Sequence, residues 1–262
     1  MRLIITNKVG LWAANYIKKI INSNNKINLP TVLGLPTGST PLAMYETLIK
    51  MVQKKEVSFK DVITFNMDEY IGLAPDHPQS YHYFMFHNFF NHIDIDKKNV
   101  HIPNGNATDI AKECEEYENK IKEAKQIDLF VGGVGEDGHL AFNEPYSSLS
   151  SRTRDKDLQL STIEANARFF NNKDEVPKKA ITVGIDTIMA AKQVMILISG
   201  YKKAKILRYL LEEGISSKVP ISILQMHPKS IIVADDDACS DIKVKTYKYF
   251  KNMQDEYTNI EV

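Results

Sequence analysis

The sequence predicts an α/β protein with one doubly wound, mostly parallel open sheet and helices on both of its faces. Short apolar runs typical of buried strands alternate along the chain with segments of helical periodicity, and the connections between them are short. Repeated strand–helix–strand units of this kind favour a Rossmann-like parallel sheet. The chain has 262 residues, 43% of them hydrophobic, which suits one large core, so we expect a single domain over residues 1–262.

The first half of the chain supplies four strands and four helices. Apolar residues recur at helical spacing from Val9 to Ile21, and Pro41 suits the first position of a helix that Thr40 would cap. The expected strands are Arg2–Ile5, Thr31–Leu35, Val62–Phe65 and Leu129–Val131, and the expected helices are Val9–Ile21, Pro41–Lys54, Tyr81–Phe90 and Ala111–Lys125.

The second half of the chain repeats the pattern after one long interruption. The expected strands are Ala180–Val183, Val194–Ile198 and Ser230–Ala234, and the expected helices are Lys202–Glu213 and Ile242–Asn252. The interruption, Tyr146–Lys179, is polar and irregular, and such a stretch in a compact α/β domain is either a functional flap or a disordered excursion. Because it directly follows a charged glycine-rich loop, we favour a flap at about residues 158–180.

Charge and cysteine usage exclude several classes of function. The 33 basic and 33 acidic residues are interspersed and give a net charge of zero, so neither a nucleic-acid nor a membrane-surface partner is expected. The two cysteines, Cys114 and Cys239, belong to no metal or disulfide spacing pattern, so we expect no metal site and a reducing compartment. Without a signal-peptide pattern or a membrane-spanning apolar run, the sequence predicts a cytoplasmic protein.

The glycine-rich stretch from Gly132 to Pro145 concentrates titratable side chains directly after the central predicted strand. Asp137 and His139 are two positions apart and can point the same way if the backbone is extended, and Glu144 can fold back towards them. Two carboxylates around an imidazole can handle protons, because one fixes the ring tautomer while the other exchanges a proton with a substrate. The alternative is a glycine-rich turn with solvated charges, and this stretch alone does not separate the two.

Two further loops follow predicted strands. The stretch Gly34–Pro41 opens a helix, where backbone N–H groups and hydroxyls form an anion site that suits a monophosphate; the alternative is simply a well-capped helix start. Asp68 and Glu69 end the next strand, where adjacent acids are costly to bury unless paired or used; the alternative is a turn-capping Asp beside a solvated Glu. Because all three loops fall at one edge of the sheet, their coincidence favours a functional site.

Five stretches of the chain, in the same order, resemble the glucosamine-6-phosphate deaminase family. They are GLPTGSTP, TFNMDEY, GGVGEDGHLAFNEP, LQMHPKS and IKVKTYKYF, and the resemblance runs from Met1 to about Asn252. It implies an enzyme of amino-sugar catabolism that converts glucosamine 6-phosphate and water to fructose 6-phosphate and ammonia. The reaction combines an aldose–ketose isomerisation with hydrolytic deamination, and the family uses no cofactor.

The resemblance also implies roles for individual residues. Asp68 would be the base that moves a proton between carbons C2 and C1 of the substrate. His139, flanked by Asp137 and Glu144, would open the sugar ring. The residues implied to bind the phosphate are Thr37, Gly38, Ser39, Thr40, Arg168 and Lys203.

Some members of the resembled family are activated by N-acetylglucosamine 6-phosphate at a second site between subunits, and the family includes monomers and hexamers. The matching positions here are Ser147, Arg154, Lys156 and Tyr249. Asp157, however, stands where a Thr is expected, and a carboxylate beside a bound phosphate repels it. The resemblance therefore implies weak activation or none in this chain, and a homo-oligomer only if it follows the hexameric members.

Two other functions fit parts of the pattern. A 6-phosphogluconolactonase-type hydrolase shares the Asp-Gly-His loop, but lactone hydrolysis needs no enolising base, so Asp68 and Glu144 argue against it. A non-catalytic sugar-phosphate-sensing domain would reuse the fold, but no helix-turn-helix or basic extension precedes the first strand. Deamination is the function that the sequence favours.

Overall fold

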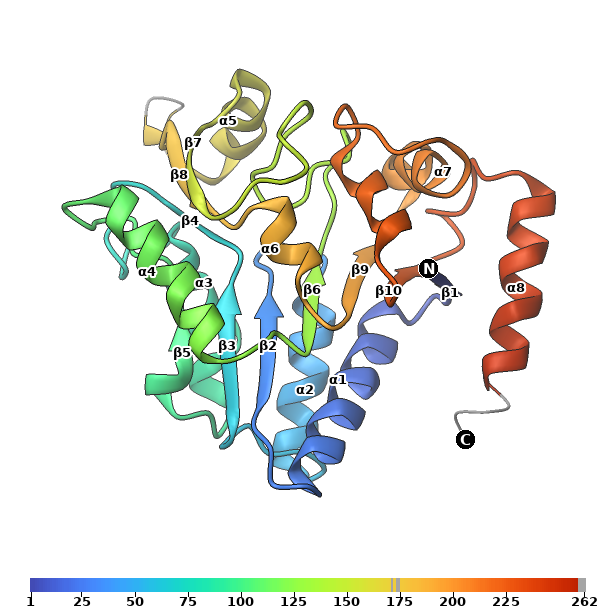
Figure 1. Ribbon diagram of the computed structural model, residues 1–262, viewed down its shortest axis with the longest axis horizontal. Coiled ribbons are helices and arrows are strands. Elements are labelled where there is room, and N and C mark those ends of the chain that lie inside the picture. The colour runs from blue at the N-terminus through green and yellow to red at the C-terminus, as the bar shows by residue number, and fades with distance from the viewer. Residues whose placement is uncertain (171, 173–174, 259–262) are drawn as a thin grey trace.

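Seven parallel strands form the centre of the computed structural model, which describes residues 1–170, 172 and 175–258 (Figure 1). Their order in the sheet is β1-β10-β9-β6-β2-β3-β5, and all neighbouring strands pair in parallel. The strands are β1 (Arg2–Ile5), β2 (Thr31–Leu35), β3 (Val62–Asn66), β5 (Val100–His101), β6 (Leu129–Gly132), β9 (Val194–Ile198) and β10 (Ser230–Ala234). The predicted doubly wound, mostly parallel sheet is confirmed.

Helices cover both faces of this sheet, because alternate side chains of each strand enter different hydrophobic clusters. Leu129 and Val131 of β6, for example, join one cluster, whereas Phe130 joins the other. The first cluster contains α1 (Val9–Asn25), α2 (Leu42–Gln53) and α3 (Tyr81–Asn88), and the second contains α4 (Ile110–Glu123), α6 (Ile185–Met189) and α7 (Ala204–Glu212). Burial on both faces explains why the central strands read as uninterrupted apolar runs.

A second, antiparallel sheet lies at the carboxyl end of β3 and corrects the sequence expectation. It consists of β4 (Asp68–Tyr70), β8 (Lys179–Thr182) and β7 (Arg154–Asp157). The strand expected at Ala180–Val183 exists, but it belongs to this sheet and not to the parallel one. The strands β4 and β7 escaped prediction because the sequences DEY and RDKD carry no apolar alternation, so only the pairing with β8 makes them strands.

The segment Tyr146–Lys179, which the sequence suggested to be irregular, contains regular elements among its described residues. Besides β7 it contains α5 (Leu160–Asn166) and the 3₁₀ turn η3 (Ala167–Phe169). In Figure 1 these elements lie beyond the upper, carboxyl ends of the parallel strands. Of the flap expected at about residues 158–180, residues 171, 173 and 174 lie outside the described residues.

The topology itself points to one crevice. From β2 the chain continues to β3 and β5 on one side, and from β6 it continues to β9 and β10 on the other. The neighbouring strands β2 and β6 thus form a topological switch point, where open α/β sheets bind ligands beyond the carboxyl ends of the strands. The loops that follow β2 and β6 are the two glycine-rich stretches singled out in the sequence.

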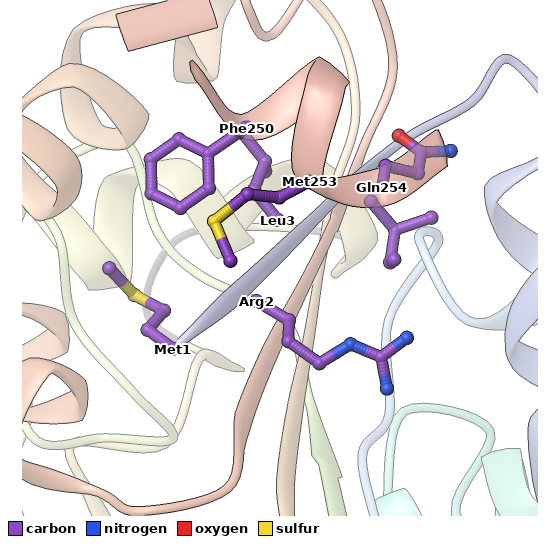
Figure 2. Close-up of a pocket in the computed structure, with 7 residues that line it drawn as sticks. Met1, Arg2, Leu3, Phe250, Met253 and Gln254 are labelled. Carbon is purple, nitrogen blue, oxygen red and sulfur yellow. The ribbon is translucent and has the colours of Figure 1, made fainter. Parts of the chain in front are cut away.

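The opposite edge of the sheet is covered by α8 (Val244–Thr258), the C-terminal helix, which is longer than expected. The Gln254 side chain accepts a hydrogen bond from the Ile5 N–H (2.9 Å) and donates to the Ile5 carbonyl (3.4 Å), as a neighbouring strand would. Figure 2 shows a narrow pocket between β1 and α8, whose lining includes Phe250 and Met253. This edge is thus protected from pairing with another strand. No helix in the described part of the chain is long and apolar enough to cross a membrane.

Candidate active site

Asp68 is a buried acid at the carboxyl end of the sheet. It is the first residue of β4, which a single residue, Met67, separates from the end of β3. Its backbone pairs with Thr182 of β8. The residue is only 7% exposed, and no described residue donates a hydrogen bond to its carboxyl group. Burial, reinforced by the neighbouring charge of Glu69, raises the pKa of Asp68 to about 8. A carboxyl group tuned towards neutrality can take and return a proton, as a general base must.

Glu69, and not Asp68, caps the neighbouring helix, which corrects the alternative considered for this pair. Its carboxylate accepts hydrogen bonds from the backbone N–H groups of Tyr70 (2.8 Å), Tyr81 (2.9 Å) and His82 (2.8 Å). Tyr81 and His82 are the first residues of α3, whose N–H groups lack partners inside the helix. Burial raises the pKa of Glu69, and these three N–H groups oppose that shift.

The loop after β6 brings His139 and Asp137 together. Nδ1 of His139 lies 2.7 Å from Oδ1 of Asp137, which is off the axis of the ring N–H, and the His139 backbone N–H donates to the same oxygen at 3.2 Å. Burial raises the pKa of Asp137, but the contacts with His139 outweigh it, so the pKa lies below its ordinary value. Asp137 therefore stays ionised and favours a proton on Nδ1, which leaves Nε2 to exchange protons.

Two glycines make this loop possible. A Cβ atom on Gly135 would overlap the His139 ring and the Asp137 carboxylate, so only glycine permits the loop to close on itself. Gly138 has a φ of +89°, a left-handed conformation that side chains disfavour. The spacing of the two titratable residues is thus set by the glycines around them.

Glu144 lies at the far end of the same loop, where it is 2% exposed. Of the two carboxylates expected to flank His139, the structure pairs Asp137 with the ring and binds Glu144 to α5. Oε1 of Glu144 accepts hydrogen bonds from the Gln159 N–H (3.1 Å) and the Thr162 hydroxyl (2.6 Å), at the start of that helix. Glu144 therefore connects the loop after β6 to the segment expected to form the flap.

The loop after β2 presents free backbone donors. None of the N–H groups of residues 37–40 donates a hydrogen bond to another described residue, and Gly38 has a φ of +100°. The expected cap by Thr40 is wrong: α2 begins at Leu42, Pro41 occupies the cap position, and no side chain bonds to this helix end. Unsatisfied N–H groups at the start of a helix form an anion site, so the missing cap leaves the donors available to a ligand.

The other two expected phosphate ligands differ in position. Lys203 ends the 3₁₀ turn η5 (Tyr201–Lys203) between β9 and α7, where burial lowers its pKa and the charges of Glu136 and Asp137 oppose that shift. The structure thus brings Lys203 to the loop after β6. Arg168 lies exposed in the η3 turn after α5, on the segment that Glu144 holds.

The four residues implied in a second site do not meet within one chain. Ser147 is buried at the end of the loop after β6, and Arg154 and Lys156 lie on β7. Tyr249 is 59% exposed on α8, which lies on the opposite side of the molecule from β7 (Figure 1). A site made from all four residues needs a second copy of the chain.

Asn143 is a residue of this region that the sequence argument did not single out. Its fully buried amide donates to the carbonyls of Leu140 (2.9 Å) and Val183 (2.8 Å) and accepts from Nη2 of Arg154 (2.9 Å). It thereby joins the loop after β6 to the second sheet. The local sequence does not distinguish it from a solvated loop Asn, because the Val183 carbonyl and the Arg154 side chain come from other segments of the chain. Among the described residues, no three His, Cys, Asp or Glu side chains are grouped so as to hold a metal ion.

Comparisons with known proteins agree with this arrangement. The family described as glucosamine-6-phosphate isomerases/6-phosphogluconolactonase matches residues 6–233. A glucosamine-6-phosphate deaminase of Fusobacterium nucleatum is 56% identical over 265 aligned positions, which cover 100% of this chain and 97% of that protein. The glucosamine-6-phosphate deaminase of Dictyostelium discoideum is 54% identical and covers 97% of this chain and 98% of its own length.

Solved structures give the same result. One described as a monomeric glucosamine-6-phosphate deaminase superposes with a TM-score of 0.88 at 40% identity and covers 92% of this chain and 100% of its own. The 6-phosphogluconolactonase of Thermotoga maritima has a TM-score of 0.72 at 21% identity, covering 89% and 98%, and is thus a likeness of fold alone. From its sequence match, its full-length relatives and its fold, the chain belongs to the family of glucosamine-6-phosphate isomerases and 6-phosphogluconolactonases.

Proposed function

We propose that this chain is a glucosamine-6-phosphate deaminase, which converts glucosamine 6-phosphate and water into fructose 6-phosphate and ammonia. The observation that carries the proposal is Asp68, a buried carboxyl group whose pKa is raised to about 8 beside a switch-point crevice. The names of full-length relatives at 54–56% identity support it. Because the reaction adds water and releases the amino nitrogen, the enzyme acts as a hydrolase on a C–N bond that also isomerises the sugar.

The substrate phosphate would be held by the loop after β2. The free N–H groups and hydroxyls of residues 37–40 offer neutral donors at the start of α2, and Lys203 supplies a positive charge from the neighbouring loop. Arg168 would reach the phosphate as the α5 segment closes. A fixed phosphate converts binding energy into orientation of the reacting carbons.

The His139–Asp137 pair would open the sugar ring. Asp137 holds the proton on Nδ1, so Nε2 can accept the proton of the anomeric hydroxyl and deliver it to the ring oxygen. The products are an open-chain aldehyde and an unchanged imidazole. Glu144, which bridges this loop to α5, would keep the pair in place and couple ring opening to closure of the flap.

Asp68 would then perform the isomerisation. Its carboxylate removes the proton from C2 while the C1 oxygen takes up a proton, which gives an enediol-like intermediate, and it then returns a proton to C1 as the amino nitrogen loses one. The C2 carbon becomes an imine, water adds to it, and ammonia leaves to give the ketose. A base buried in this way needs no strong acidity of the substrate, because its own affinity for a proton is raised.

The decisive experiment is incubation with glucosamine 6-phosphate while free ammonia and fructose 6-phosphate are assayed, with 6-phosphogluconolactone supplied in parallel. We expect equal amounts of ammonia and fructose 6-phosphate, and a loss of turnover of a hundredfold or more in Asp68→Asn. Hydrolysis of the lactone without release of ammonia would overturn the proposal in favour of a lactonase. Binding of both sugar phosphates without turnover would favour a sensing domain.

A further inference from the structure

Glu69 is the buried acid that directly follows the proposed catalytic base in the sequence. It is 3% exposed, and its carboxylate accepts three backbone N–H groups at 2.8–2.9 Å, two of them from the first turn of α3. The Ser80 hydroxyl accepts the next N–H of the helix, that of Tyr83, at 3.0 Å. Glu69 and Ser80 therefore share the N-terminus of α3 and together satisfy its first donors.

This contact fixes the orientation of Asp68. Successive side chains of a strand leave its opposite faces, so a strand whose Glu69 reaches α3 must turn Asp68 the other way. The strand β4 has only three residues, and a slip of one position would exchange the two acids. The pairing of β4 with β8 does not prevent such a slip by itself, because backbone hydrogen bonds are indifferent to side-chain identity.

We propose that Glu69 is a positioning residue for the catalytic base: its anchored carboxylate fixes the face on which β4 presents Asp68, and its negative charge strengthens Asp68 as a base. The reading of Asp68 as the base rests on the proposed deaminase function, whereas the interaction between the two acids does not. Three N–H donors and the positive end of α3 stabilise the ionised form of Glu69 and oppose the effect of burial, which raises its pKa.

Other groups around Asp68 carry no charge near neutral pH. Tyr70 on β4, Tyr81 on α3 and Tyr117 on α4 all interact electrostatically with Asp68. Burial raises the pKa of each, to about 12 for Tyr70, so they remain neutral. His82 also faces Glu69 through its backbone, but burial lowers the pKa of its ring. Glu69 is thus the charged group, among the described residues, that acts on Asp68.

The test is to titrate the Asp68 carboxyl carbon by NMR in protein labelled at aspartate, with the resonance assigned by its loss in Asp68→Asn. We expect a midpoint near 8 in the wild type. In Glu69→Gln it should fall by about one pH unit, the size expected for one charge a few ångströms away in a partly shielded setting. The acid limb of kcat/KM for glucosamine 6-phosphate should move down by the same amount, because less of the base is protonated.

Ser80→Ala is the matched control. It removes a cap from the same end of α3 without changing charge, so the Asp68 midpoint should stay within a few tenths of a unit. An unchanged midpoint in Glu69→Gln, or an equal shift in Ser80→Ala, would overturn the proposal. So would a wild-type Glu69, followed by glutamate labelling, that remains protonated while Asp68 titrates. If the wild type releases no ammonia, the function fails while these titrations still decide the role of Glu69.

Discussion

The Asp68→Asn variant should be more stable than the wild type by an amount that grows as the pH rises, although it lacks the proposed base. Burial and the Glu69 charge raise the pKa of Asp68 from its ordinary 3.8 to about 8. Between these values the native state holds a proton that the unfolded chain has released. The number of protons bound is then larger in the native state, so the free energy of unfolding falls as the pH increases.

The magnitude follows from the difference between the two pKa values. It is roughly four units, which at about 1.4 kcal/mol per unit amounts to on the order of 5 kcal/mol once the pH exceeds 8. The asparagine variant lacks this dependence. A buried amide has its own cost of about 1–3 kcal/mol where it finds no partner, but that cost does not change with pH. The difference in free energy of unfolding between variant and wild type therefore reports on the buried acid through its slope against pH. Its pH-independent offset does not.

The assay is urea unfolding of both proteins at pH 5, 6, 7, 8 and 9. The free energy of unfolding of Asp68→Asn minus that of the wild type should grow by about 1.4 kcal/mol per pH unit up to pH 8 and then level off. Titrating groups that do not interact with Asp68 are common to both proteins, so their contributions cancel. Two parallel curves would refute the reasoning, because they would mean that Asp68 has the same pKa in the folded and unfolded chains. If the free energy of unfolding fell more steeply with pH in the variant than in the wild type, the pKa of Asp68 would be lowered by folding and not raised.

Three further predictions concern the crevice and the second site. Lys203→Ala should raise KM for glucosamine 6-phosphate about tenfold or more, because it removes a charge-assisted contact to the phosphate. Lys202→Ala, at an exposed neighbouring residue, should not raise KM, and equal effects of the two variants would argue against a specific role for Lys203. Gly135→Ala should lower kcat about tenfold or more, because the added Cβ would displace His139. Gly133→Ala, where a Cβ meets nothing within 4 Å, should change kcat little, and similar kcat values for the two variants would contradict the tight packing of His139 against Gly135. Millimolar N-acetylglucosamine 6-phosphate should leave the KM of the wild type nearly unchanged and lower the KM of Asp157→Thr. A large drop in the KM of the wild type would show that Asp157, whose Oδ1 lies 3.5 Å from Nζ of Lys179, does not disfavour the effector.

Local patterns were sufficient for six of the seven parallel strands and for the position of the crevice, whereas the two-residue β5 was not expected. Runs such as VMILI and SIIVA are buried on both faces, so their apolar character continues without interruption and marks them as central strands. The glycine-rich loops that follow β2 and β6 lie at the switch point as expected, because the carboxyl ends of parallel strands must share one edge. The contact between Asp137 and His139 also follows from spacing, since both residues are in one tight loop.

Partners remote in sequence could not be read from those patterns. The strand RDKD exists because β8 offers it a backbone edge, and the capping carboxylate of α3 comes from a strand twelve or thirteen residues earlier. Neither pairing leaves a mark on the local sequence. Thr40 likewise has the residue type of a helix cap, but no side chain caps α2, and the N–H groups of residues 37–40 before it donate to no described residue.

By itself the sequence determined the fold class, the family and the three loops that contain the proposed catalytic and phosphate-binding residues. It could do so because hydrophobic periodicity and short motifs are local properties of the chain. Only the tertiary structure decided that Asp68 is buried, that Glu69 is tied to α3, and that Glu144 binds α5 and not His139. Burial and electrostatic coupling depend on which segments enclose a side chain. They arise when the second sheet closes over the carboxyl ends of the first, and so they belong to the fold as a whole.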